Sequence, residues 1–152
     1  MTKLLRMERA TTAGNIASPP GIRIVPYCAC LHHALIPGLY AASFKEDPWL
    51  ADWDSIEEFD PQGVFLGVDE DTQEAVGFVI CFRRRDLGYI SVVAVVPAYR
   101  RRGIASALVG TAIDYLRSLG LDTARIDAYE GSVPAVRTYQ KLGFQVVGIV
   151  YE

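Results

Sequence analysis

The chain has 152 residues, of which 51% are hydrophobic and 22% are charged, and its net charge is −3. This length is typical of one domain with its own core, and the hydrophobic content excludes disorder throughout. The acidic balance argues against a nucleic-acid partner, since such proteins normally present a strongly basic face. No apolar run approaches the roughly 18 residues that a membrane span requires, so we expect no membrane partner and a cytoplasmic location.

The first 20 residues predict a flexible leader. Charged residues interrupt them early, at Arg6, Glu8 and Arg9, and residues 11–21 are rich in turn formers and small polar residues. Neither feature is typical of a secretory signal. We therefore place a single domain over residues 21–152.

Four side chains that can bind metal fall within six residues: Cys28, Cys30, His32 and His33. A zinc site normally needs a second ligand pair at a defined spacing, and none follows downstream. The interpretation that we favour is a helix that carries these residues, with no metal. Three cysteines in total, an odd number, do not predict a disulfide framework.

Apolar runs and turn residues predict an α/β fold with a mixed sheet. Three strands joined by short turns form an antiparallel meander, and a crossover helix makes the next strand parallel to the last of them. In chain order the predicted elements are a strand at 23–26, two helical pieces within 28–44 interrupted at Pro37 and Gly38, strands at 63–69, 75–82 and 89–96, a helix ending at Gly120, a strand at 124–128, a helix at 132–142 and a strand at 144–151.

Residues 45–60 hold one lysine and seven acids, interleaved with aromatic residues. Two interpretations stay open. The simpler one, which we favour, is an amphipathic helix with a solvated acidic face. The other is an acidic mouth with aromatic walls that receives a cationic group.

The bend between the strand at 89–96 and the following helix predicts an anion site. Pro97 ends the strand, three arginines and Gly103 follow, and a helix begins. The N–H groups in a helix's first turn have no partner within the helix, and the helix dipole adds partial positive charge there. The glycine spacing of a dinucleotide-binding turn is missing, and so is a Walker A loop.

Two motifs identify a family. The run V-x-P at 95–97 followed by R-x-x-G-x-A at 100–105 resembles the coenzyme A-binding motif of the GNAT superfamily of N-acetyltransferases. Residues 134–144, PAVRTYQKLGF, resemble that family's A-x-x-x-Y-x-x-x-G-F signature. The resemblance implies a single-domain GNAT-like fold: a mixed, mostly antiparallel sheet, splayed between two central parallel strands, with helices on both faces.

The resemblance also implies a cofactor site. The backbone of Val93, Ala94 and Val95 would run along the pantetheine arm, and the Val95 N–H would polarise the thioester carbonyl. The pyrophosphate would lie on the amides at the helix start, with arginine side chains adding charge. Ser132 stands where the family often has asparagine, and its reach toward the pantetheine is shorter. The residues implied at the phosphates are Arg100, Arg101, Arg102, Gly103, Ile104, Ala105 and Ser106.

Catalytic roles follow from the same resemblance. Tyr139 matches the tyrosine that protonates the departing thiolate, although it could instead be a core aromatic residue. Asp127 aligns with the general base of ribosomal-protein N-terminal acetyltransferases and would act through a water; a strand-end carboxylate without a catalytic role is the alternative. Glu130 and Glu58 are further candidates. Tyr89 stands where histone-type enzymes carry their glutamate, so the sequence does not predict a general base of the histone type at this position.

The function implied is acetyl transfer from acetyl-CoA directly to a primary amine, on a small molecule or a peptide, in a ternary complex. Neither a metal nor a covalent acyl-enzyme is needed. The alternative is a non-catalytic acyl-CoA-binding sensor. Many members of the family continue past the equivalent of Glu152 with one more strand, so we expect either a compact version of the fold or a homodimer that covers an exposed sheet edge.

Overall fold

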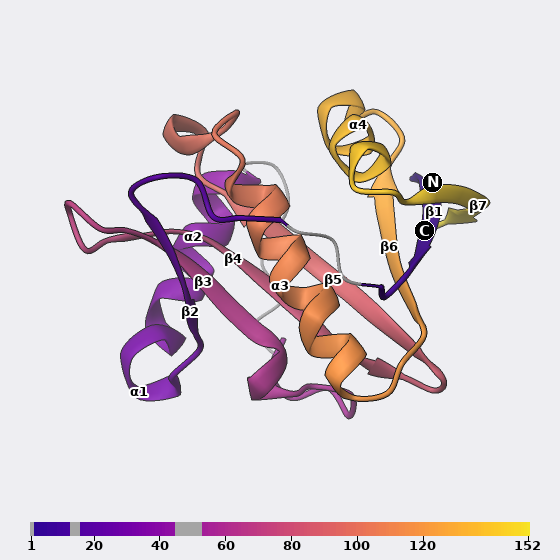
Figure 1. Cartoon of the computed structure of the whole chain (residues 1–152), viewed down its shortest axis with the longest axis horizontal. Coiled ribbons are helices and arrows are strands. Elements are labelled where there is room, and N and C mark those ends of the chain that lie inside the picture. Colours follow the sequence, from indigo (N-terminus) through magenta and orange to yellow (C-terminus); the bar gives the residue numbers. More distant parts are fainter. Residues whose placement is uncertain (1, 13–15, 45–52) are drawn as a thin grey trace.

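The computed structural model describes residues 2–12, 16–44 and 53–152, which form one open seven-stranded sheet with helices on both faces (Figure 1). The spatial order of the strands is β2-β3-β4-β5-β6-β1-β7. Only β5 and β6 pair in parallel; every other neighbouring pair in this sheet is antiparallel. The strands are β1 (Lys3–Ala10), β2 (Ile22–Pro26), β3 (Val64–Asp69), β4 (Ala75–Arg84), β5 (Leu87–Val95), β6 (Thr123–Tyr129) and β7 (Gln145–Tyr151).

Helices cover the two faces of this sheet. Helix α3 (Ile104–Ser118) packs on β3, β4 and β5 from one side, whereas α2 (Ile36–Ser43) packs on β4 and β5 from the other. The other helices are α1 (Ala29–His32) and α4 (Val133–Lys141), and single 3₁₀ turns lie at His33–Leu35, Pro61–Gly63 and Pro97–Tyr99. None of the helices in the described ranges is long and apolar enough to cross a membrane.

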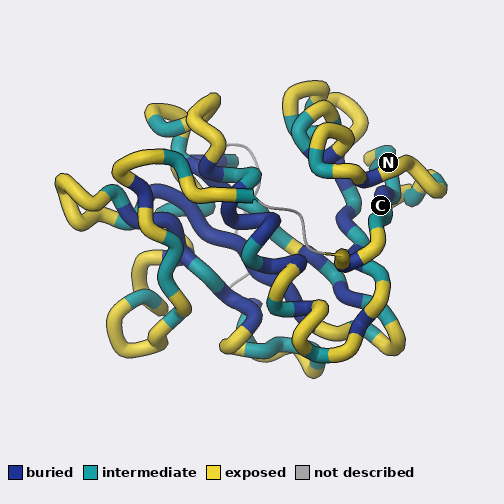
Figure 2. Tube along the Cα trace, in the orientation of Figure 1, coloured by how far each residue is buried: buried dark blue, intermediate teal, exposed yellow. Residues whose placement is uncertain are grey.

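The strand alternation of β4 divides the core into two clusters. Val79 and Cys81 belong to the cluster under α3, whereas Phe78 and Phe82 belong to the one that faces α2. Side chains alternate between the faces of a strand, so a strand covered on both sides reads as a continuous apolar run. Burial is accordingly greatest in the middle of the sheet and along the inner side of α3 (Figure 2).

Helix α3 follows the predicted amphipathic pattern. Leu108, Ile113 and Leu116 are almost fully buried, and all lie on the side that meets the sheet. The helix ends before Gly120, whose φ of +82° is the left-handed conformation that glycine adopts most easily. The predicted strands, the two helices that correspond to α3 and α4, and the mixed sheet are thus confirmed.

The prediction of a flexible leader is wrong for residues 3–10. They form β1, which lies between β6 and β7 and pairs antiparallel with both. Met7 is fully buried, and the pattern is strand-like because Leu5 and Met7 face the core while Arg6 and Glu8 face the other side. The partner of the last strand therefore comes from the start of the chain.

The two parallel strands diverge, as the resemblance implied. Their pairing runs only from Gly88↔Ala124 to Ile90↔Ile126, although β5 continues to Val95. The register of β5 against β4 also shifts at this point, leaving Ser91 as the extra residue of a bulge. A bulge bends its strand, so it turns β5 away from β6 where their pairing stops.

The break in the helical region 28–44 lies earlier than predicted. A 3₁₀ turn at His33–Leu35 separates α1 from α2, and Pro37 sits in the first turn of α2. Proline is tolerated there because the N–H that it lacks would have no partner within the helix.

The acidic stretch 45–60 is described only from Trp53 onward, and residues 45–52 lie outside the described residues. Trp53 is 9% exposed and packs edge-on against Tyr27 and Phe59. Glu58 pairs with an arginine and Asp60 accepts a hydrogen bond from Tyr115, so this part of the stretch is engaged in packing and polar contacts.

Candidate active site

A cavity of about 530 Å³ opens where β5 separates from β6. The end of α2 lines it from one side of the sheet, while the turn before α3 and helix α4 line it from the other. Of the residues predicted to bind the cofactor or to act in catalysis, those that line the cavity are Val93, Val95, Arg100, Arg101, Gly103, Ile104, Ala105, Ser106, Ser132 and Tyr139. Ala94, Arg102 and Asp127 lie outside the lining.

The turn before α3 presents free backbone donors to the cavity. The first N–H of the helical ladder belongs to Ala107, which donates to the Gly103 carbonyl, so the N–H groups of Gly103 to Ser106 have no intrahelical partner. No side chain caps this helix start. Arg101 and Gly103 both have positive φ, of 64° and 84°. A left-handed arginine is strained, and such strain gathers at sites where backbone geometry serves a function.

The end of β5 also directs donors into the gap. The Val96 N–H donates to the Val76 carbonyl on the β4 side. Successive N–H groups of a strand point in opposite directions within the sheet, so the Val95 N–H points toward the side where β6 has diverged. The Val95 carbonyl accepts from Arg100, which fits this orientation.

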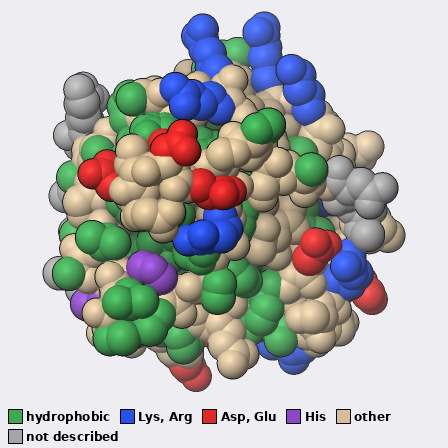
Figure 3. Space-filling model, turned by 60° about the vertical axis from the view of Figure 1, so that its left-hand side comes forward, with side chains coloured by type: hydrophobic (Ala, Val, Ile, Leu, Met, Phe, Trp, Pro, Cys, Tyr) green, Lys and Arg blue, Asp and Glu red, His purple; other side chains and the backbone are tan. Residues whose placement is uncertain are grey.

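The three arginines of the turn lie in different places. Arg100 donates to the Val95 carbonyl and to the Ser43 carbonyl, so it ties the end of β5 to the end of α2. Arg102 stacks on the Tyr99 ring at 4.8 Å. Arg101 lines the cavity. Figure 3 shows basic side chains gathered along the upper edge of the molecule, the end at which Figure 1 places this turn and α4.

Tyr139 brings a protonated phenol to the cavity. It lies on α4, is 9% exposed, and packs edge-on against Phe144 with ring centroids 6.1 Å apart. Burial raises its pKa to about 12. The hydroxyl is therefore protonated at neutral pH, which is the form that can donate a proton.

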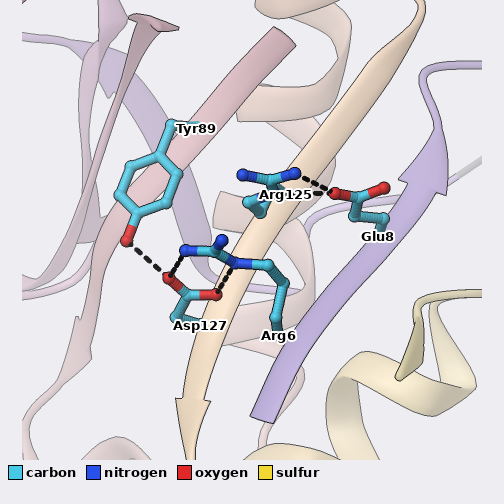
Figure 4. A network of polar contacts seen from close by, with 5 residues as sticks. All are labelled: Arg6, Glu8, Tyr89, Arg125 and Asp127. Carbon is cyan, nitrogen blue, oxygen red and sulfur yellow. Dashed lines mark hydrogen bonds and ion pairs between the residues drawn. The ribbon is translucent and has the colours of Figure 1, made fainter. Parts of the chain in front are cut away.

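Asp127 lies at the fork, which is the point where β5 and β6 separate. It is one residue past the last parallel pair, on the sheet face that α2 covers. Its carboxylate accepts two hydrogen bonds from Arg6, at 3.0 and 3.1 Å, and one from the Tyr89 hydroxyl at 3.0 Å (Figure 4). Only 7% of the side chain is exposed. Burial and the neighbouring Asp127 charge raise the pKa of Tyr89 to about 12, so Tyr89 acts here as a donor.

The other predicted acids lie in surface ion pairs. Glu130 pairs with Lys3 at 3.1 Å, and Glu58 pairs with Arg84 at 3.0 Å. The four clustered Cys and His residues make local contacts: the Cys28 N–H donates to His32 Nδ1, and the sulfurs of Cys28 and Cys30 are 3.2 Å apart. In the described ranges, no three Cys, His, Asp or Glu residues are arranged to hold a metal ion.

The sequence prediction missed Arg6, the partner of Asp127, because it was assigned to the leader. The signal was the alternation of apolar and charged residues from Leu5 to Glu8, which is typical of a strand with two different faces. Ser43 and Phe44 were also missed as cavity residues, because nothing in the sequence places the end of α2 beside the turn before α3.

A splayed parallel pair beside a helix start with free donors defines an α/β fold whose geometry suits a phosphate-bearing ligand. The sequence profile of the Acetyltransferase (GNAT) family matches residues 31–144, and the chain belongs to that family. The family assignment made from the two motifs is thereby confirmed.

Individual relatives agree with this assignment. A mycothiol acetyltransferase of Mycobacterium avium is 29% identical over 97% of this chain and 54% of its own length. The chain thus spans about half the length of the curated relatives that it matches.

Solved structures show the same fold. A GCN5-related N-acetyltransferase from Sphaerobacter thermophilus superposes with a TM-score of 0.84 and 23% identity, over 97% of this chain and 49% of that one. The NatC complex bound to Gag peptide and CoA superposes with a TM-score of 0.66 and 23% identity, over 80% of this chain and 82% of that one.

Proposed function

We propose that this protein transfers the acetyl group of acetyl-CoA directly to a primary amine. The observation that carries the proposal is the cavity at the fork, because one space brings together the free N–H groups of the α3 start, the inward-pointing Val95 N–H and the protonated Tyr139. The arginine-rich turn suits a diphosphate, and the unpaired inner side of β5 suits the amide groups of a pantetheine arm.

Each donor has a separate task. The cosubstrate supplies an acetyl group activated as a thioester. The Val95 N–H donates to the thioester carbonyl oxygen, where negative charge develops during attack. Tyr139 gives its proton to the sulfur that leaves, and the acceptor amine loses one proton. For a neutral amine these two transfers balance, because the proton lost from nitrogen as the amide forms replaces the one that Tyr139 gives to sulfur. The attack on the thioester is direct, so the proposal needs neither a metal nor a covalent acyl-enzyme.

Asp127 is the proposed acceptor of the amine's proton. An amine attacks only when unprotonated, so an acceptor that arrives as an ammonium must lose one further proton to a base on binding. Asp127 is not part of the cavity lining, and its short side chain would act through a bridging water. All three acids are in ion pairs, and the position of Asp127 at the end of the parallel pairing favours it over Glu58 and Glu130, whose side chains are more exposed.

A small-molecule amine is the acceptor that we favour. The curated relatives are named for mycothiol, and the chain matches one of them over 97% of its own length. The peptide-bound neighbour is similar in fold alone. We extend the proposal to a cytoplasmic protein and to a homodimer that covers the outer edge of β7, where Val147, Ile149 and Tyr151 are exposed.

The alternative is a sensor that binds acyl-CoA without turnover. One feature favours it: Ser132 stands where the family often has asparagine, and it makes no side-chain cap on α4. The test measures coenzyme A release with a panel of amines, beside calorimetry with acetyl-CoA. Amine-dependent release supports the transferase, whereas tight binding with no release from any amine would support the sensor. If calorimetry detects no binding of coenzyme A or acetyl-CoA, both fail.

A further inference from the structure

Two ion pairs connect β1 to β6, and both join residues that lie directly opposite in the sheet. Arg6 faces Asp127, and Glu8 faces Arg125 two positions along (Figure 4). Both pairs lie on the sheet face that α2 covers. They differ in their surroundings: Asp127 lies at the fork, is more buried and also accepts from Tyr89, whereas the side chains of Glu8 and Arg125 bond only to each other among the contacts that the described residues make.

The contacts fix the Asp127 carboxylate almost completely. Arg6 donates through Nε to one oxygen and through Nη2 to the other, and Tyr89 donates to the second oxygen from β5. A paired guanidinium holds the plane of a carboxylate as well as its position. A carboxylate can accept about four hydrogen bonds, so three fixed donors leave about one lone pair free.

We propose that Arg6 is a positioning residue for the transfer reaction. Together with Tyr89, it holds the Asp127 carboxylate at the fork so that its remaining lone pair faces the water that takes the proton of the acceptor amine. The N-terminal strand thereby contributes to the active site as well as to the sheet. This inference rests on the proposed function, because it assigns Arg6 a role through Asp127.

A purely structural role would be shared by the two pairs. Glu8 and Arg125 join the same strands, at 2.6 and 2.7 Å, and their side chains are each 24% exposed. Loss of either pair removes one cross-strand contact of similar kind. Only the loss of Arg6 releases the carboxylate at the fork, so the Glu8–Arg125 pair is a matched control on the same two strands.

The experiment uses the full chain, with acetyl-CoA and the most active amine of the panel. Arg6→Met should lower kcat about 10- to 100-fold and leave the KM for acetyl-CoA unchanged, since misplacing a catalytic group by about 1 Å can lower rates by that much. Glu8→Gln should stay within about twofold of the unmodified protein, with a smaller loss of melting temperature than Arg6→Met, because Arg6→Met leaves the buried Asp127 carboxylate without its ion-pair partner. Arg6→Lys keeps the positive charge but not the paired guanidinium donors, so its kcat should fall between those of the other two variants.

A double variant separates positioning from an independent effect. Asp127→Asn and the combination of Arg6→Met with Asp127→Asn should show the same kcat, because a residue that acts through Asp127 has nothing left to position. Two losses that multiply would overturn the proposal. So would an Arg6→Met enzyme as active as the Glu8→Gln control.

Two further outcomes are also decisive. If Arg6→Met does not fold, Arg6→Lys and Tyr89→Phe take its place, and wild-type kcat in both would overturn the proposal. If no amine of the panel makes the unmodified protein release coenzyme A, the proposed function fails, and this inference fails with it. An active protein with an unaffected Arg6→Met variant would refute the positioning role alone.

Discussion

Replacing Tyr139 by phenylalanine tests the proposed acid with the least structural disturbance. The ring is 9% exposed and packs on Phe144, and phenylalanine keeps that contact. The change removes only the hydroxyl, so the free energy of unfolding should stay within about 1 kcal/mol and acetyl-CoA affinity should be nearly unchanged.

The expected loss in kcat is about 100-fold. General acid catalysis contributes about 10²–10⁴-fold, and acids are most effective when their pKa lies near the working pH. Burial raises the pKa of Tyr139 to about 12, which makes it a weaker acid than free tyrosine and favours the lower end of that range. A 100-fold loss corresponds to about 2.7 kcal/mol of transition-state stabilisation.

The assay follows coenzyme A release at saturating acetyl-CoA over a range of pH. The acid acts in its protonated form, and its raised pKa keeps the hydroxyl protonated to higher pH. Tyr139 should therefore cause no loss of activity until the pH approaches about 12. Tyr139→Phe turning over at the full rate would refute the assignment. A weakened affinity for acetyl-CoA with kcat unchanged would refute it as well, because the hydroxyl would then serve binding.

The remaining predictions concern the fold, the cofactor turn and the assembly. Met7→Ala should lower the free energy of unfolding by about 2–5 kcal/mol in urea titrations, because Met7 lies on β1 and is fully buried; no change would contradict the burial of this strand. Gly103→Val should fold but weaken acetyl-CoA binding at least tenfold in calorimetry, since φ is +84° there, a conformation that strains valine, and Gly103 lines the cavity; unchanged affinity would exclude the turn as the phosphate site. Light scattering after size-exclusion chromatography should find a dimer at micromolar concentration, and a result of monomer alone would refute the proposed homodimer at the edge of β7.

The sequence predicted local elements well because each of them has a local signal. The spacing of Leu108, Ile113 and Leu116 predicts one buried side of a helix, and the structure shows it. The break before α2 was misplaced because a proline is compatible with two positions, inside a turn or in the first turn of a helix. Which one applies depends on how the helix meets the sheet.

The site was predictable only in part. The residues of the turn before α3 lie close together in the chain, so a motif could place six of them in one cavity; Val93, Val95, Ser132 and Tyr139 bring the predicted lining residues to ten. The partners of Asp127 could not be predicted in this way. Arg6 is 121 residues away along the chain, and Tyr89 lies on another strand.

By itself, the amino-acid sequence determined the family, the helix start with its unpaired N–H groups and most of the strands, because periodicity and backbone chemistry act over a few residues. The tertiary structure alone decided where residues 3–10 go. A strand becomes stable when both its edges find partners, and here β6 and β7 supply them from the far end of the chain. That long-range pairing brings Arg6 to Asp127, a contact for which no local pattern carries information.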